Sequence, residues 1–172
     1  MDQYSNGRTA KGGQRAATPA KRVDVVTLKL VRESSFLYGN RRVRTPADAA
    51  SMVREFLEDA DREHLCVVCL DTKHQPTAVH TASVGTLNAT AVHPREVFKV
   101  AVLSNSAAVI LAHNHPSGRP EPSHQDLEMT RRVSRAGEIL GIEVLDHVII
   151  GSGGRYVSLK ERGLMGGGDS DR

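Results

Sequence analysis

Apolar residues recur along this chain at two different periods, and the changes of period predict where helices and strands lie. Between residues 45 and 60 they fall three or four positions apart, after a Thr-Pro-Ala-Asp start typical of a helix N-terminus. Two further helices are expected at 94–103 and 124–140, and Gly141 is expected to end the last one. The residues predicted to face the core are Ala49, Met52, Val53, Phe56, Leu57, Ala60, Val97, Val100, Ala101, Leu127, Thr130, Val133 or Ser134, Gly137 and Leu140.

Strands are predicted between the helices, where short apolar runs are bounded by turn residues. The run at 65–70 is apolar throughout, so both faces of that strand should be buried. Partial alternation over 22–31 indicates a further strand at a sheet edge, where it could pair with another chain. The order of elements predicts an α/β fold, with a mixed β-sheet flanked by helices. The remaining strands are expected at 77–84, 107–112, 142–150 and 156–159.

The chain has 172 residues and a formal net charge of +3, which suits one globular domain with its own core. The positive excess lies in residues 1–22, where five basic residues accompany one acidic residue. We expect this stretch to be a disordered tail, with residues 23–164 forming the domain and 165–172 a flexible end. The last 150 residues hold 18 basic and 19 acidic residues, so a DNA-clamping surface is not indicated. The basic tail could contact nucleic acid weakly.

No apolar run approaches the length of a membrane span, and no stretch reads as a signal peptide. We therefore expect a cytoplasmic protein without membrane contact, and the two cysteines agree with a reducing compartment. Cys66 and Cys69 lie three residues apart on a predicted strand, so their thiols should point to opposite faces. The pair is thus expected to fill the core rather than to bind a metal.

The clearest candidate chemistry lies where the apolar run 107–112 breaks into a loop rich in proline and glycine. His113 and His115 leave this run two positions apart, so in an extended chain they point to the same side. Ser123 is expected to cap the next helix, which puts Asp126 on its first turn, although Ser-x-x-Asp alone is also an ordinary capping box. Imidazole and carboxylate suit Zn²⁺, and three protein ligands with one open position are typical of a catalytic site.

The spacing His-x-His, seven residues, Ser-x-x-Asp over 113–126 is similar to the JAMM metalloprotease motif. Longer segments narrow the resemblance to the RadC branch of the JAB/MPN domains, over about residues 45–163. The resemblance implies a JAB/MPN fold, which is cytidine deaminase-like in architecture, and one Zn²⁺ per chain. Longer relatives carry a helix-hairpin-helix-like region before this domain, for which this chain is expected to lack room. The RadC-like segments are 85–88 (Gly-Thr-Leu-Asn), 92–96 (Val-His-Pro-Arg-Glu), 113–118 (His-Asn-His-Pro-Ser-Gly) and 145–149 (Leu-Asp-His-Val-Ile).

The resemblance also implies roles for residues outside the ligand set. In the family a glutamate about 50 residues before the histidines moves protons, and Glu63 stands at that distance from His113. Glu96 is the competitor, but its place in the chain does not fit the family order. Ser123 resembles the serine that helps to stabilise the tetrahedral intermediate. Asn114 stands where peptidase members carry Ser or Thr.

Two further residues, Asp146 and His147, lie on the strand predicted at 142–150. They are expected either to orient a metal ligand or to form a satisfied core pair. His93, which precedes a proline, is expected to be structural.

Taken together, these residues predict a zinc metallohydrolase that cuts a peptide or an isopeptide-like amide. The alternative is an accessory protein of DNA repair or of mobile elements, which the RadC resemblance and the basic tail suggest. A zinc deaminase is disfavoured, because the His-x-Glu and Pro-Cys-x-x-Cys patterns of those sites are absent. A binding module in which zinc is structural or lost stays open, as do the substrate and the oligomeric state.

Overall fold

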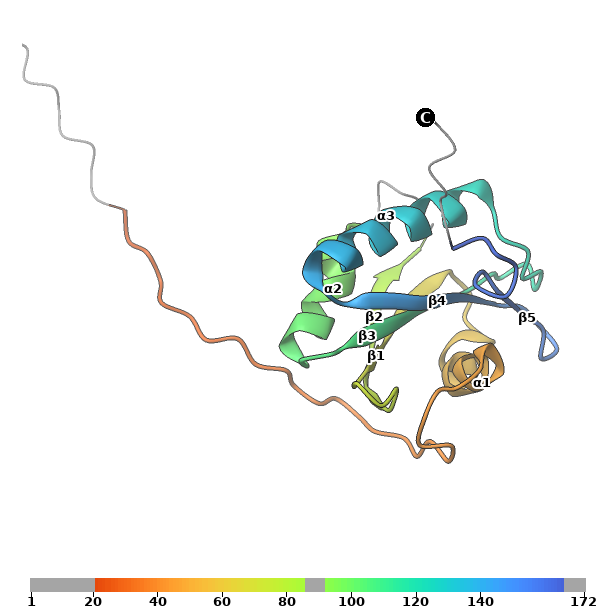
Figure 1. Ribbon diagram of the computed structural model, residues 1–172, viewed down its shortest axis with the longest axis horizontal. Coiled ribbons are helices and arrows are strands. Elements are labelled where there is room, and N and C mark those ends of the chain that lie inside the picture. The colour runs from red at the N-terminus through yellow and green to blue at the C-terminus, as the bar shows by residue number, and fades with distance from the viewer. Residues whose placement is uncertain (1–20, 86–91, 166–172) are drawn as a thin grey trace, which may run out of the picture.

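The computed structural model describes residues 21–85 and 92–165, and a five-stranded mixed sheet forms the centre of this part (Figure 1). The strands stand in the order β2-β1-β3-β4-β5, with α1 on one face and α2 and α3 on the other. The predicted α/β fold is confirmed, and the helices at 94–103 and 124–140 have the predicted bounds. The elements are α1 (Pro46–Leu57), β1 (His64–Leu70), β2 (Pro76–Val84), α2 (Pro94–Leu103), β3 (Ala108–Asn114), α3 (His124–Leu140), β4 (Glu143–Ile150) and β5 (Tyr156–Ser158).

The strand β3 joins the two halves of the sheet. It pairs antiparallel with β1, so that Leu65 lies opposite His113, and parallel with β4, so that His113 lies beside Ile149. The helix α3 connects the parallel pair, and the carboxyl ends of β3 and β4 therefore meet at one edge, next to the loop that enters α3. Ligand sites in α/β folds commonly form at such an edge.

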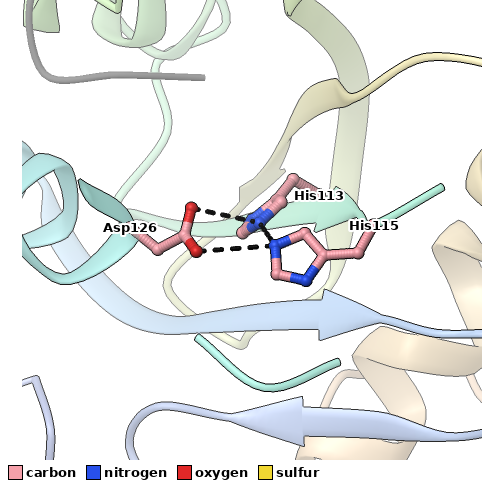
Figure 2. Close-up of side chains that lie close together, drawn as sticks. All are labelled: His113, His115 and Asp126. Carbon is pink, nitrogen blue, oxygen red and sulfur yellow. Dashed lines mark hydrogen bonds and ion pairs between the residues drawn. The ribbon is translucent and has the colours of Figure 1, made fainter. Parts of the chain in front are cut away.

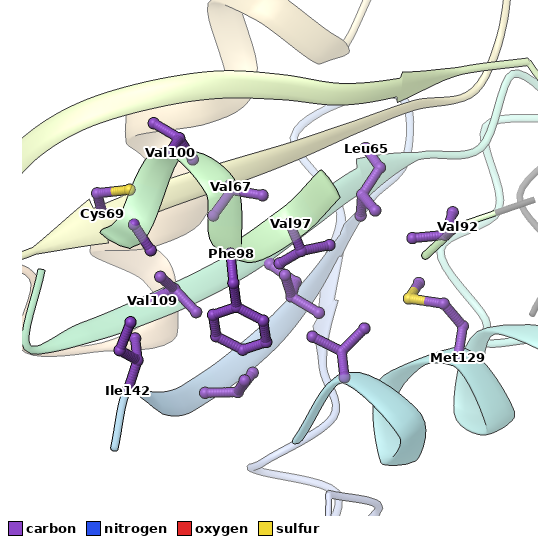
Figure 3. Packing of buried hydrophobic residues seen from close by; sticks show 14 residues of the cluster. Leu65, Val67, Cys69, Val92, Val97, Phe98, Val100, Val109, Met129 and Ile142 are labelled. Carbon is purple, nitrogen blue, oxygen red and sulfur yellow. The ribbon is translucent and has the colours of Figure 1, made fainter. Parts of the chain in front are cut away.

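Two apolar clusters hold the helices on the sheet. On one face, Val97 and Phe98 of α2 pack with residues of β1, β3 and α3 (Figure 3). On the other face, α1 packs with the alternate residues of the same strands. Cys69 belongs to the first cluster and Cys66 to the second, and both are free and buried. The prediction that these thiols fill the core on opposite faces is confirmed.

Two residues predicted to lie in the core are exposed instead. Phe56 is 43% exposed and Leu140 is 50% exposed, although helical spacing placed both on the apolar stripe. Phe56 packs edge-on against Phe36, with ring centroids 5.0 Å apart, on the outer side of α1. Leu140 is the last residue of α3, where the chain turns at Gly141 in the left-handed region with φ 68°. The spacing of apolar residues predicts which side of a helix faces the sheet, but it does not predict how far along the helix the sheet covers that side.

The strand predicted over 22–31 is wrong. Residues 21–38 form neither a helix nor a strand, and the edges of the sheet are β2 and β5. Alternation of apolar and polar side chains is not sufficient for a strand, because a strand also needs an adjacent segment whose backbone N–H and carbonyl groups are free to pair with it. Val25 and Leu37 are fully exposed in this segment, with relative exposures of 101% and 103%. Most of the predicted tails, residues 1–20 and 166–172, lies outside the described residues.

None of the helices in the described part is long and apolar enough to cross a membrane.

The helix α1 begins with the predicted capping box. The Asp48 backbone N–H donates to Thr45 Oγ1 at 3.2 Å, and the Asp48 carboxylate accepts from the Thr45 N–H at 3.1 Å. The same carboxylate accepts from the Arg44 N–H and from Asn40 Nδ2, each at 2.9 Å. These bonds, the one from Arg44 above all, hold the pKa of Asp48 below its usual value.

We expect Asp48→Ala to lower the free energy of unfolding at pH 7 by about 1 kcal/mol, the usual contribution of a helix cap. Because the folded-state pKa is lowered, this contribution is complete above the usual Asp pKa of about 4 and is lost as the pH falls through the lowered value. Urea unfolding at several pH values measures the difference. The exposed Asp59, just beyond α1, provides the control Asp59→Ala, and equal stability of both variants at pH 7 would contradict the capping role.

Candidate metal centre

Three side chains that could hold a metal ion meet at the carboxyl end of β3. His113 is a residue of β3, His115 follows the strand directly, and Asp126 lies in the first turn of α3. The His115 N–H donates to the Ile150 carbonyl at 3.0 Å, which keeps the chain extended alongside β4 until both histidines have passed. The chain then turns, with the Gly118 N–H donating to the His115 carbonyl at 2.8 Å.

The ligand atoms of these residues face one another (Figure 2). The Nε2 atoms of His113 and His115 are 2.9 Å apart. His113 Nε2 lies 3.3 Å from Asp126 Oδ1, and His115 Nε2 lies 3.4 Å from Asp126 Oδ2. The side chain of His113 is 0% exposed and that of Asp126 is 4% exposed, whereas that of His115 is 14% exposed. Solvent therefore reaches this cluster on the His115 side.

The protonation of His113 follows from a chain of hydrogen bonds behind it. The Thr130 hydroxyl donates to the Asp126 carbonyl at 2.6 Å, so its oxygen must accept the 2.6 Å bond from His147 Nδ1. With its proton on Nδ1, His147 presents an Nε2 lone pair, and His113 Nδ1 donates to it at 2.7 Å. The remaining nitrogen of His113, Nε2, then carries a lone pair that points into the cluster.

His115 reaches the same state by a shorter route. Its Nδ1 donates to the carbonyl oxygen of Arg119 at 2.7 Å, an acceptor without a proton to give. The Nε2 atom of a neutral His115 therefore also carries a lone pair, directed at His113 and Asp126.

Two lone pairs and a carboxylate at hydrogen-bonding distance repel one another unless a positive charge lies between them. A divalent metal ion supplies that charge, and the donor set of two imidazoles and one carboxylate is one that such ions accept. The spacing is also suitable, because ligands bound tetrahedrally at 2.0–2.1 Å stand roughly 3.3 Å from one another. His113, His115 and Asp126 thus fit a metal ion.

The electrostatics agree with neutral rings at His113 and His147, whereas His115 is shifted toward its protonated form. Burial, followed by the charge of His147, holds the pKa of His113 well below its usual value, so the imidazole is neutral at pH 7. Burial alone would raise the pKa of Asp126, but the neighbouring imidazoles of His115 and His113 and the hydrogen bonds from Ser123 outweigh it and lower that pKa. The Asp126 carboxylate raises the pKa of His115, so His115 is the ring of this cluster that takes up a proton when no other cation is present. Burial also lowers the pKa of His147 to about 4, which keeps that ring neutral.

Ser123 caps α3 and at the same time holds Asp126. Its backbone N–H and its hydroxyl donate to Asp126 Oδ2 at 2.7 and 2.6 Å, and its oxygen accepts from the Asp126 N–H at 3.2 Å. Both readings of the Ser-x-x-Asp sequence are therefore realised in one geometry: a capping box and an oriented carboxylate.

Glu63 directly precedes the first residue of β1. Continuing the register that pairs Leu65 with His113 places Glu63 opposite His115, and the Glu63 charge contributes to raising the His115 pKa. Asn114, between the two histidines, fixes the backbone on both sides of Glu63. Its Oδ1 accepts from the His64 N–H at 2.8 Å, and its Nδ2 donates to the Arg62 carbonyl at 2.9 Å.

The competing glutamate lies elsewhere. Glu96 is on α2, 41% exposed, and its carboxylate is 2.6 Å from Lys99 Nζ and 3.5 Å from Arg95 Nε. The hydrogen bond from Lys99 is the main reason that the pKa of Glu96 lies below its usual value. His93, for which a structural role was predicted, accepts from Arg132 Nη2 at 3.1 Å.

Sequence reasoning left open whether Asp146 and His147 orient a ligand or form a core pair, and the structure shows both. His147 bonds to His113, while Asp146 is buried and accepts from the Ser158 hydroxyl at 2.6 Å and from the Lys160 N–H at 3.0 Å. Thr130 was assigned only to the core. The signal in the sequence was its position four residues after Asp126, one helical turn on, where a buried hydroxyl can support a metal ligand through hydrogen bonds.

The protein is an α/β domain with a candidate metal centre at the carboxyl end of β3. Comparisons with known proteins identify the family of this domain. The chain matches the family model described as the RadC-like JAB domain over residues 43–164. The chain belongs to this family.

Named relatives support the same assignment. A "UPF0758 protein" of Desulfitobacterium hafniense is 48% identical over 166 residues, which cover 96% of this chain and 69% of that protein. Proteins of the same name from Desulforamulus reducens and Rubrobacter xylanophilus are 49% and 50% identical over 150 and 143 residues. Those alignments cover 86% and 82% of this chain, and 66% and 62% of the two relatives. The names state no activity.

We expect Thr130→Val to weaken the binding of Zn²⁺ by about 10- to 100-fold, the usual effect of losing a group that orients a ligand. The reason is that His147 loses the acceptor that fixes its proton on Nδ1, and with it the tautomer it imposes on His113. Competition with a chromophoric chelator measures the affinity. The control is Ser134→Ala on the same helix, because the buried Ser134 hydroxyl has no hydrogen-bond partner among the described residues. Unchanged affinity in Thr130→Val would show that the hydrogen bonds from Thr130 through His147 to His113 do not support metal binding.

Proposed function

We propose that this chain is a zinc-dependent hydrolase of the JAMM type, which cuts a peptide or isopeptide-like amide bond. The observation that carries the proposal is the convergence of two imidazole lone pairs and one carboxylate, with access from the side of His115. Three protein ligands with one side open are the arrangement of catalytic zinc sites, whereas structural sites are closed by a fourth protein ligand. Membership of the RadC-like JAB family supports the same reading.

When bound, Zn²⁺ supplies Lewis acidity that brings the pKa of a coordinated water to about 7. His113 and His115 would hold the ion through Nε2, and Asp126 would hold it through Oδ1, since Oδ2 already accepts two bonds from Ser123. The bonds that His113 donates to His147 and that His115 donates to the Arg119 carbonyl keep both rings oriented for this task.

Glu63 is the group that we propose moves the proton. A carboxylate beside the attacking water can accept its proton and then pass it to the leaving amine. The register of β1 and β3 and the two hydrogen bonds of Asn114, one accepted from the His64 N–H and one donated to the Arg62 carbonyl, support this role, because they tie the backbone on both sides of Glu63 to the strand that carries His113. Asn114 would thus be a positioning residue for Glu63, which gives a reason for an amide where other peptidases of this type carry a hydroxyl.

Ser123 has one role in the structure and a second in the proposal. Its hydroxyl donates to Asp126, which orients the ligand. Stabilisation of an oxyanion by the same hydroxyl requires it to turn away from Asp126 toward the substrate, while the Ser123 N–H keeps its bond to Oδ2.

A role linked to nucleic acid is the second hypothesis and rests on the basic residues of 1–22 and on the family resemblance. The matched segment 43–164 itself holds 13 Lys and Arg against 15 Asp and Glu, so it offers no overall positive charge to a phosphate backbone. The metal centre therefore favours the hydrolase over the nucleic-acid accessory protein.

We expect Glu63→Gln to keep bound zinc and to lower the rate of peptide hydrolysis by at least about 100-fold, the lower end of what general acid–base catalysis contributes. Peptides from denatured casein, incubated with zinc-loaded protein and examined by mass spectrometry for new amino termini, provide the assay. Glu96→Gln is the control and should retain the wild-type rate. Retained cleavage in Glu63→Gln would exclude Glu63 from the mechanism, and cleavage that survives complete removal of zinc would exclude the metal.

A further inference from the structure

A pocket of about 500 Å³ opens beside the candidate metal centre. It is lined by His115 together with Ser117, Arg119, Glu121 and Arg155. His115 belongs to both the pocket and the metal centre, so a molecule bound in the pocket lies next to the open side of the ligand cluster. The charged residues of this lining have no part in the hydrolysis proposed above.

Two glycines bring the walls of the pocket together. A side chain at Gly118 would come within 2.5 Å of Ser152 Oγ, and one at Gly151 would come within 2.7 Å of the Gly118 carbonyl. Glycine at both positions therefore lets the turn before β5 pack directly against the loop that follows His115. This contact places Arg155, which is 40 residues from His115 in the sequence, at the mouth of the metal centre.

The guanidinium of Arg155 is fixed by carbonyl groups rather than by an acid. Its Nη2 donates to the Gly118 carbonyl at 2.9 Å and to Ser152 Oγ at 3.2 Å, and its Nε donates to the Ser152 carbonyl at 3.1 Å. Its Nη1 group makes none of these bonds. A guanidinium held in this way keeps its full charge and retains donors for a ligand.

Arg119 is attached to the metal centre through its main chain. Its carbonyl accepts from His115 Nδ1 at 2.7 Å, so a change of position of Arg119 would alter the metal ligand itself. The residue is exposed, and among the described residues neither Arg119 nor Arg155 makes an ion pair with a carboxylate. The lining of the pocket thus includes two arginines and one acid, Glu121.

We propose that this pocket binds a carboxylate group of the peptide substrate, so that the enzyme selects chains with an acidic group near the bond to be cut. This inference rests on the proposed function. Arginine is well suited to the task, because its planar donors match the two oxygens of a carboxylate. Glu121 in the lining disfavours a run of phosphates, and so does the balance of 13 basic and 15 acidic residues over 43–164. The carboxylate belongs either to an Asp or Glu side chain or to the end of a peptide chain.

The test is an NMR titration of ¹⁵N-labelled, zinc-loaded full-length protein with three short peptides. The first, acetyl-Ala-Ala-Glu-Ala-Ala-amide, carries an acidic side chain. The second has Gln in place of Glu, and the third is the Gln peptide with a free terminal carboxylate. We expect at least one carboxylate peptide to bind at least tenfold more tightly than the neutral peptide, with shifts at Ser117–Arg119 and Ser152–Arg155. The tighter of the two carboxylate peptides identifies the source of the group.

Variants assign the effect to the pocket. Arg119→Gln and Arg155→Gln should each reduce the preference for a carboxylate, and Arg95→Gln, an exposed arginine of α2, should leave it unchanged. Arg155 also bonds to the loop at Gly118, so Arg155→Gln could unfold the protein. In that case Arg119→Gln decides the outcome. Equal binding of all three peptides, or shifts confined to other surfaces, would overturn the proposal. Tighter binding of a 12-base-pair DNA duplex at these same residues would overturn it in favour of nucleic acid.

The result can be separated from the fate of the hydrolase. Binding is measured without turnover. A carboxylate preference without any cleavage would therefore support the binding pocket and contradict the proposed hydrolase. Cleavage of casein peptides without a carboxylate preference would do the reverse.

Discussion

The interaction on which this structure depends is the mutual approach of two imidazole nitrogens and a carboxylate at the end of β3. Each nitrogen presents a lone pair, because Thr130, His147 and the Arg119 carbonyl determine where the protons of the rings reside. Such a group is unfavourable without a positive charge at its centre, and burial makes the requirement stronger by lowering the local dielectric. The cluster is therefore best understood as a site that the fold prepares for a cation.

The fold keeps this cluster together by making β3 the common partner of everything around it. The antiparallel pairing with β1 sets Leu65 opposite His113, and the parallel pairing with β4 brings His147 behind His113. The helix α3 supplies Asp126 and Thr130 one turn apart. The same helical geometry therefore fixes both the metal ligand and the hydroxyl that begins the chain of hydrogen bonds to His147 and His113. Apolar clusters on both faces of the sheet hold these elements in register.

The sequence was sufficient for the features that depend on local chemistry. The Ser-x-x-Asp cap and the Gly141 end defined α3, and the two-residue spacing of the histidines predicted their common side. Features that depend on contacts across the sheet could not be predicted in this way. Thr130 was assigned only to the core, Asp146 and His147 had two open readings, and Arg155 was not singled out, since nothing local to these residues reveals a partner on another element. The error over 22–31 has the same origin, because alternation does not reveal whether a neighbouring strand exists.

The most direct test of the central claim is a crystal structure of the zinc-loaded protein with data collected on both sides of the zinc absorption edge. The account predicts one zinc per chain, bound by Nε2 of His113, Nε2 of His115 and one oxygen of Asp126 at about 2.0–2.2 Å, with a remaining position open to solvent. Zinc bound through other residues, or an ordered site in which these three side chains hold no metal, would contradict it.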